Sequence, residues 1–150
     1  MISSLQSVQN TAARIVTLTR KFDHITPVLI QLHWLPVHFR ILFKILFLVY
    51  KALNGMAPLY FTELVSYRTC SRTLRSTATD QKLLAVPKSR FKTYGDKAFS
   101  VAAPKLWNEL PLDLRSLDTI NLFKKHLKTC LLYTSPSPRD LSTSRMPSSA

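Results

Sequence analysis

The side chains best suited to chemistry in this sequence are basic, and most of them gather in one stretch of the chain. Residues 67–105 hold nine lysines and arginines but only two acidic residues, Asp80 and Asp96. A guanidinium can fork onto two phosphate oxygens, and an ammonium supplies a compact positive charge to the same group. Seven residues are therefore candidate contacts to a nucleic-acid backbone: Arg68, Arg72, Arg75, Lys88, Arg90, Lys92 and Lys97.

Aromatic residues lie among these basic residues. Tyr67, Phe91, Tyr94 and Phe99 occur in the same stretch, and aromatic rings can stack on bases of any sequence. Basic residues in an irregular segment suit contacts to the phosphate backbone better than reading of base edges. The alternative interpretation is a solvated basic surface that keeps the protein in solution.

Catalytic motifs are weak throughout the sequence. Tyr94-Gly95-Asp96 is similar to the turn on which polymerases hold two metal ions with adjacent carboxylates. The next residue is Lys97, whose charge would repel a metal ion, so we interpret Asp96 as a turn residue after a glycine. We predict that the chain is not an enzyme and takes no small-molecule substrate.

The histidines and cysteines do not form a familiar site either. The spacing of His24, His33 and His38 matches no familiar metal site, and we interpret them as packed or surface imidazoles. Cys70 has no evident histidine–acid partnership that would activate a nucleophile. We predict no metal and no cofactor.

Composition limits the classes of protein that remain. The chain has 150 residues, 46% of them hydrophobic, and only two glycines, which leaves no Gly-rich phosphate-binding loop. The formal net charge is +13 and the pI is about 10.2, which favours a polyanionic partner. The longest apolar run, residues 41–50, is too short to span a bilayer, so no membrane role is expected. No secretory signal is visible, and we expect an intracellular, non-secreted protein.

Hydrophobic periodicity predicts a mainly α-helical protein. A first helix carries an apolar stripe of Leu5, Val8, Ala12, Ile15 and Val16, and Thr26-Pro27 opens a short second helix. Residues 38–53 form the strongest helix, so apolar that it is either the centre of a bundle or packs on a missing partner. A short helix over 59–65 follows, then extended candidates at 82–87 and 90–94 that allow at most a short β-hairpin.

The C-terminal part contains two further predicted helical elements. Pro104 and Pro111 bracket a turn or a single helix, and a last helix begins near Asp118 or Thr119. We divide the chain into a helical region 1–66, a basic loop-rich segment 67–105, a C-terminal helical segment 106–129 and a tail 130–150. Residues 1–129 are expected to form one small domain.

The tail differs in composition from the rest of the chain. Residues 130–140 resemble the translated end of a transposase-based sequencing-library adaptor, and residues 144–150 resemble the other end of the same adaptor. The alternative is a natural Ser/Pro-rich tail. Because the tail carries two arginines and one aspartate, the chain without it still has a net charge of +12. We therefore expect a non-native, disordered tail and exclude it from functional reasoning.

An ordered series of stretches resembles one protein family. Two of these stretches are Leu32-His-Trp-Leu-Pro-Val37 and Ala103-Pro-Lys-Leu-Trp-Asn108. The others cover residues 5–15, 22–28, 40–45, 50–55, 57–58, 74–76, 94–100, 110–111 and 123–125. Together they resemble the region that follows the reverse transcriptase in polyproteins of LINE-type (non-LTR) retrotransposons, over about residues 5–129.

The resemblance implies a fragment of a multifunctional element protein. Such a protein is an RNA-directed DNA polymerase, but its polymerase and endonuclease acids have no matching positions here, and the C-terminal cysteine/histidine cluster of some members is also absent. The implied partners are RNA or DNA and the upstream reverse transcriptase domain, in a ribonucleoprotein of the nucleus or cytoplasm. The expected function is non-catalytic nucleic-acid binding. A docking module for the polymerase, with helix 38–53 as its contact, and a functionless element remnant remain alternatives.

The two resemblances lead to a prediction about the gene. Genomic sequence is expected to continue upstream of Met1 towards a Tyr-x-Asp-Asp polymerase core and to diverge from this chain near residue 130. Sequencing the locus tests both expectations. A genome that encodes residues 130–150 contiguously with the preceding codons would overturn the adaptor interpretation.

Overall fold

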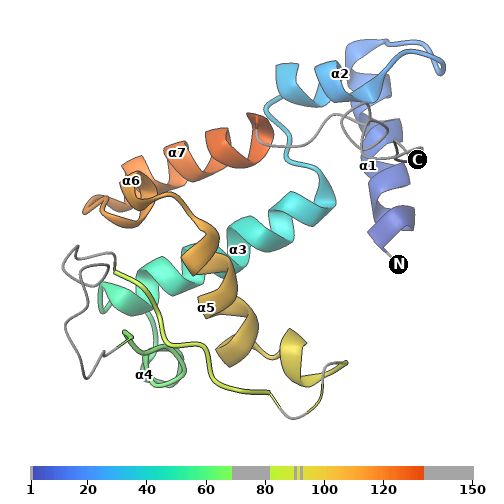
Figure 1. The fold of residues 1–150 in the computed structure, drawn as a ribbon. Helices are drawn as coiled ribbons and strands as arrows, with labels where there is room; N and C mark the ends of the chain where they lie inside the picture. The colour runs from blue at the N-terminus through green and yellow to red at the C-terminus, as the bar shows by residue number, and fades with distance from the viewer. Residues whose placement is uncertain (1, 69–81, 90, 92, 134–150) are drawn as a thin grey trace, which may run out of the picture.

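The computed structural model describes residues 2–68, 82–89, 91 and 93–133 (Figure 1). Helices make up most of these residues, which confirms the predicted mainly α-helical class. The elements are α1 (Ile2–Thr17), α2 (Ile25–Gln31), α3 (Val37–Leu53), α4 (Leu59–Thr62), the 3-10 helix η2 (Gly95–Lys97), α5 (Phe99–Glu109), α6 (Leu112–Arg115) and α7 (Ile120–Tyr133). Extended pairing within the described ranges is an isolated antiparallel bridge between Tyr67 and Leu84.

Helix α3 is the central element of the fold. It begins after Pro36 and ends where Gly55 takes a left-handed conformation with a φ of 67°. A side chain would strain that conformation, so the glycine ends the helix as the sequence predicts. Helices α5 and α7 pack along α3, α4 packs against it, and α1 contacts it as well (Figure 1). The chain's own helices therefore cover much of the apolar surface of this helix.

Three aromatic rings form the centre of the main core. Tyr50 of α3 stacks on Phe123 of α7 with ring centroids 4.3 Å apart, and Trp107 of α5 lies 5.9 Å from the same Phe123 ring. All three side chains are buried, and the Tyr50 hydroxyl donates a 3.0 Å hydrogen bond to the Leu117 carbonyl. Phe123 and Leu127, which lie one helical turn apart on α7, are both fully buried.

Helix α5 connects the extended residues 82–84 to this core through side-chain hydrogen bonds. The Trp107 indole N–H donates a 3.0 Å hydrogen bond to the Lys82 carbonyl. The neighbouring Asn108 side chain accepts from the Leu84 N–H at 2.9 Å and donates to the Leu84 carbonyl at 3.0 Å. Leu84 is buried, so both of its backbone groups need these partners.

The predicted start of α5 at Pro104 is wrong. The helix begins five residues earlier, at Phe99, and Pro104 lies inside it. A proline within a helix removes one backbone hydrogen bond, but here the ring is buried against the core. Burial of an apolar ring offsets part of the cost of the lost hydrogen bond.

Helix α1 faces the domain with residues that lie beside its apolar stripe instead of with the stripe itself. Leu5, Val8, Ile15 and Val16 are exposed, and Ala13 is its buried residue. On the inner side, the Gln9 amide donates to the Leu35 carbonyl and the Gln6 side chain accepts from the Val37 N–H, both at 2.8 Å. Side chain to backbone hydrogen bonds decide which side of α1 faces inward.

The shorter elements differ from the prediction mainly at their ends. Helix α2 begins two residues before Pro27, after His24, and α4 ends at Thr62 instead of residue 65. In the extended candidate 82–87, Leu84 pairs with Tyr67, and in the second candidate the described residues Thr93 and Tyr94 form a turn. The possible hairpin between these two stretches is therefore absent from the described residues. Helix α7 runs through the predicted boundary at residue 129, and Cys130 packs against the core.

The Asn108 side chain is expected to stabilise the fold through the backbone of Leu84. Asn108→Ala leaves a buried N–H and a buried carbonyl without partners, which is expected to lower the free energy of unfolding by about 2 to 4 kcal/mol. Urea unfolding of the full chain, followed by circular dichroism, measures this change. Asn121→Ala, an exposed position on α7, is the matched control and should change stability little. Equal losses in the two variants would contradict this role of Asn108.

Tyr50 is expected to make stability fall in alkaline solution. Burial, and secondarily the negative charge of Asp118, raise the pKa of its hydroxyl above the ordinary value of 10.0. The unfolded chain therefore loses this proton at a lower pH than the folded chain. The stabilisation of the fold by the protonated Tyr50 hydroxyl is complete below about pH 10. It is lost as the pH rises through the folded-state pKa of this hydroxyl.

Tyr50→Phe tests this expectation. At neutral pH the variant lacks the hydrogen bond to the Leu117 carbonyl, and its free energy of unfolding should be lower by about 1 kcal/mol. Above about pH 10 the difference between the wild type and the variant should shrink, because the variant has no proton to lose at this position. Urea unfolding across pH measures both values. A difference that stays constant up to alkaline pH would contradict the raised pKa.

Candidate nucleic-acid interface

The structure places three of the seven candidate contacts. Arg68, Lys88 and Lys97 are exposed; Arg72, Arg75, Arg90 and Lys92 lie outside the described residues. Residues 82–98 run past α4 and the N-terminal end of α5, whereas α1 and α2 lie beyond the N-terminal end of α3 (Figure 1). The three candidate contacts therefore come from one side of the fold, away from α1 and α2.

Two short extended stretches lie side by side where residues 69–81 leave and rejoin the described chain. The Arg68 N–H donates to the Leu83 carbonyl and the Ala85 N–H donates to the Ser66 carbonyl, each at 2.9 Å. These bonds flank the bridge between Tyr67 and Leu84. Residues 69–81 join the described chain at Arg68 and at Lys82. These two residues consequently lie on neighbouring stretches, which α5 holds in place.

A tight turn positions Lys97. The Gly95 N–H donates to the Phe91 carbonyl at 2.9 Å, and the Ser89 hydroxyl donates to the same carbonyl at 3.0 Å. A Cβ atom on Gly95 would lie 2.8 Å from the Ser89 hydroxyl oxygen, so a larger residue at this position would require the Ser89 side chain to shift. The 3-10 helix that follows presents Lys97 to solvent.

Large aromatic side chains are exposed next to these basic residues. Tyr94 is 84% exposed and Phe91 is 65% exposed, in the same turn as Lys97, and Tyr67 adjoins Arg68. Phe99 is different, because it is half-buried and packs edge-on against Phe61 with ring centroids 5.2 Å apart. Of the four aromatic residues proposed from the sequence, three are therefore exposed in the structure.

Two basic residues of the segment that are not among the seven candidates pair with acids. Lys105 lies 3.2 Å from Asp96, and Lys82 lies 4.0 Å from Asp118. The first pair ties η2 to α5, and the second ties residue 82 to the start of α7. Asp96 is thus bonded to a lysine in a turn, as its interpretation as a turn residue predicts.

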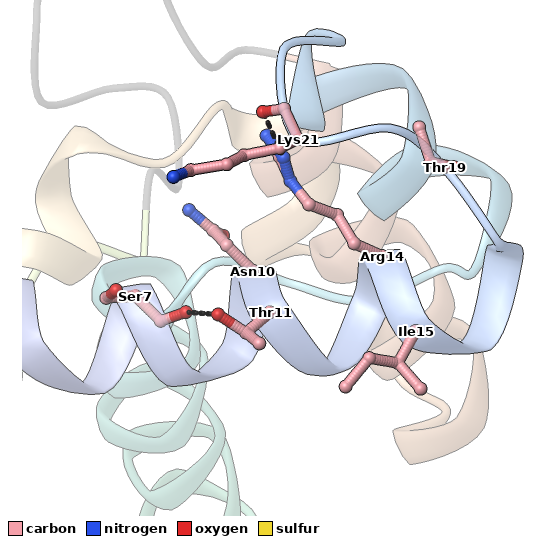
Figure 2. Close-up of a pocket in the computed structure, with 7 residues that line it drawn as sticks. All are labelled: Ser7, Asn10, Thr11, Arg14, Ile15, Thr19 and Lys21. Carbon is pink, nitrogen blue, oxygen red and sulfur yellow. Dashed lines mark hydrogen bonds between the residues drawn. The ribbon is translucent and has the colours of Figure 1, made fainter.

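A second basic location is an open hollow of about 570 Å³ beside α1 (Figure 2). The Arg14 guanidinium reaches across it and donates to the carbonyls of Lys21 and Asp23, each at 3.0 Å. Figure 2 shows Lys21 and Asn10 extending over the same hollow. The Arg14 guanidinium already bonds the connection between α1 and α2. The Lys21 ammonium is then the main group of the hollow that could bind an anion. We therefore interpret the hollow as a structural feature.

One basic feature of the structure was not found in the sequence. The Phe47 ring on α3 has the Lys51 ammonium 5.0 Å from its centroid and the Lys124 ammonium 4.8 Å from it. Phe47 and Lys51 are four residues apart, a spacing at which side chains on a helix are neighbours. The contact between them could therefore have been predicted from the sequence. The second joins α3 to α7 and depends on the tertiary fold.

The described residues do not assemble a metal site or a membrane span. No group of three potential metal ligands occurs among them, and His24, His33 and His38 do not converge on one. Within the same residues, no helix has the length and apolar character required to cross a bilayer.

Comparison with known protein families, with curated proteins and with solved structures finds no match to this chain. The resemblance to LINE-type retrotransposon proteins therefore rests on the sequence stretches alone.

Proposed function

We propose that the chain is a non-catalytic nucleic-acid-binding region, an accessory part of a non-LTR retrotransposon reverse transcriptase. The observation that carries this proposal is the attachment of the basic segment to the core. Trp107 and Asn108 hold residues 82–84, and these residues hold 66–68 beside them. Residues 69–81, which include Arg72 and Arg75, thus leave and rejoin the described chain at neighbouring positions.

The chemistry of this place suits a flexible polyanion. Lys88 and Lys97 are exposed for phosphate contacts, and the rings of Phe91 and Tyr94 are exposed beside them. Phosphate contacts and stacking depend little on base sequence. The expected ligand is single-stranded RNA or DNA, bound in the micromolar range with tolerance of sequence.

A docking role is the second candidate, and the structure favours a different surface for it. Helix α3, the contact predicted from the sequence, packs against α5 and α7 of its own chain. Among the described residues, α1 exposes a row of apolar side chains, Leu5, Val8, Ile15 and Val16. A polymerase domain that docks on this protein would therefore contact α1.

The salt dependence of binding tests the first proposal. If about four phosphates are contacted, the logarithm of the binding constant for single strands should fall with the logarithm of salt concentration with a slope near −3. Arg72, Arg75, Arg90 and Lys92 replaced together by glutamine should flatten this slope and weaken binding at low salt by at least about tenfold. Fluorescence anisotropy with labelled oligonucleotides measures both effects in the full chain.

A matched variant separates the location of the charges from their number. Replacing Arg20, Lys21, Lys44 and Lys125 by glutamine removes the same net charge from exposed positions outside the basic segment. This control should keep the steep slope, and circular dichroism should show equal helix content in both variants. Equal affinity of the basic-segment variant and the parent at low salt would overturn the proposal.

A further inference from the structure

Two lysines from different helices share one aromatic ring. The Lys51 ammonium of α3 lies 5.0 Å from the centroid of the Phe47 ring, and the Lys124 ammonium of α7 lies 4.8 Å from the same centroid. The separation of the two ammoniums therefore does not exceed about 10 Å, which is the Debye length at about 0.1 M salt. Salt at this concentration screens the repulsion between them only in part.

The two helices that carry these lysines contain no acidic residue. Together they hold six lysines and arginines: Arg40, Lys44, Lys51, Lys124, Lys125 and Lys128. In the part of the chain that the structure describes, neither Lys51 nor Lys124 pairs with a carboxylate. Asp118, which lies just before α7, is 4.0 Å from Lys82 instead. The positive charge over the Phe47 ring is therefore not neutralised by an acid of these residues.

Helix dipoles explain the place of Lys51 but not that of Lys124. Lys51 lies in the last turn of α3, where the negative end of the helix dipole favours a cation. Lys124 lies in the second turn of α7, and the effect of the dipole is confined to the terminal turns. The Phe47 ring attracts both ammoniums, but it also brings two like charges together. A bound anion would remove the repulsion that remains.

The lysine pair adjoins the place where the basic segment rejoins the described chain. Residues 69–81 rejoin it at Lys82, which lies 4.0 Å from Asp118, two residues before α7 begins. In Figure 1, the beginning of α7 and the C-terminal end of α3 lie on the side of the fold away from α1 and α2. The described candidate contacts of the basic segment come from this side as well. A nucleic-acid strand is the anion that continues from one place to the other, and this proximity selects it as the ligand.

We propose that Lys51 and Lys124 form a further phosphate contact, which holds the backbone of a strand that also contacts the basic segment. This inference rests on the proposed nucleic-acid binding and adds two residues outside the seven candidates. A lysine ammonium is a compact charge on a flexible stem, which suits contact with a phosphate and not the reading of bases. The Phe47 ring is half-buried, so we assign it to positioning the ammoniums and not to stacking on a base.

Fluorescence anisotropy of a labelled single-stranded oligonucleotide with the full chain tests this contact. Lys51→Gln combined with Lys124→Gln should weaken binding at low salt by at least about threefold and make the salt slope shallower by about 0.7 to 1.4, for one or two phosphates released. Lys44→Gln combined with Lys125→Gln removes the same charge from exposed positions of the same two helices and should keep the slope of the parent. Lys51→Arg combined with Lys124→Arg keeps both charges and should bind as the parent does. Circular dichroism should show equal helix content in all of these variants.

Acetylation of the wild-type chain tests the same contact without a substitution. A saturating amount of the oligonucleotide should slow the acetylation of Lys51 and Lys124 by acetic anhydride, because a bound phosphate covers both ammoniums. Lys44 and Lys125 should react at the same rate with and without the oligonucleotide. Mass spectrometry of the digested protein measures all four rates.

Three results would overturn the contact at Lys51 and Lys124. They are parental affinity and slope in the Lys51→Gln, Lys124→Gln variant, an equal loss in the Lys44→Gln, Lys125→Gln variant, and unchanged acetylation of Lys51 and Lys124 in the complex.

The basic-segment variant described above separates this inference from the proposed function. If that variant binds weakly and the Lys51→Gln, Lys124→Gln variant binds as the parent does, the proposed function stands and this contact fails. If the reverse is found, the contact stands and the basic segment is not the site. A parent chain that binds no oligonucleotide would overturn both.

Discussion

The hold of α5 on the backbone at residues 82–84 is the constraint on which the basic side of this protein depends. Trp107 and Asn108 are consecutive residues of one helix, and their side chains reach the same short stretch of extended chain. An isolated extended stretch has few partners for its backbone groups, and unpaired groups in a buried position are costly. Asn108 supplies both a donor and an acceptor to Leu84, as a neighbouring strand would. Without it, residues 66–68 would also lose the surface on which they pair.

Trp107 connects this attachment to the core. Its ring packs near Phe123, which in turn stacks on Tyr50, while its N–H bonds the Lys82 carbonyl. The packing of α3, α5 and α7 therefore holds the Trp107 indole in place. The indole in turn holds residues 82–84. A change that loosens the aromatic core is therefore expected to disturb residues 82–84, which Trp107 and the neighbouring Asn108 hold. Core stability and the geometry of the basic segment are in this way physically coupled.

Sequence patterns predict the helices whose apolar side chains recur at helical spacing and are buried. The bounds of α3 are set by Pro36 and Gly55, and the stripe of α7 is visible as Phe123 and Leu127, because local signals and burial agree there. The inner side of α1 was not predictable, since it is chosen by hydrogen bonds from Gln6 and Gln9 to distant backbone. The pairing of residue 84 with residue 67 likewise depends on Asn108, far along the chain. The exposure of the three described candidate basic residues follows from their charge alone. The turn before Lys97 depends on the Phe91 carbonyl, which accepts hydrogen bonds from the Gly95 N–H and the Ser89 hydroxyl.

Helix α3 separates α1 from the described residues 82–98 (Figure 1). The helix has 17 residues and is therefore about 25 Å long. Near one of its ends, Gln6 and Gln9 of α1 bond the backbone at Val37 and Leu35. Along its length, α5 packs on it and presents Trp107 and Asn108 to residues 82–84. The exposed face of α1 and the attachment of residues 82–84 are thus positioned by different contacts to the same helix.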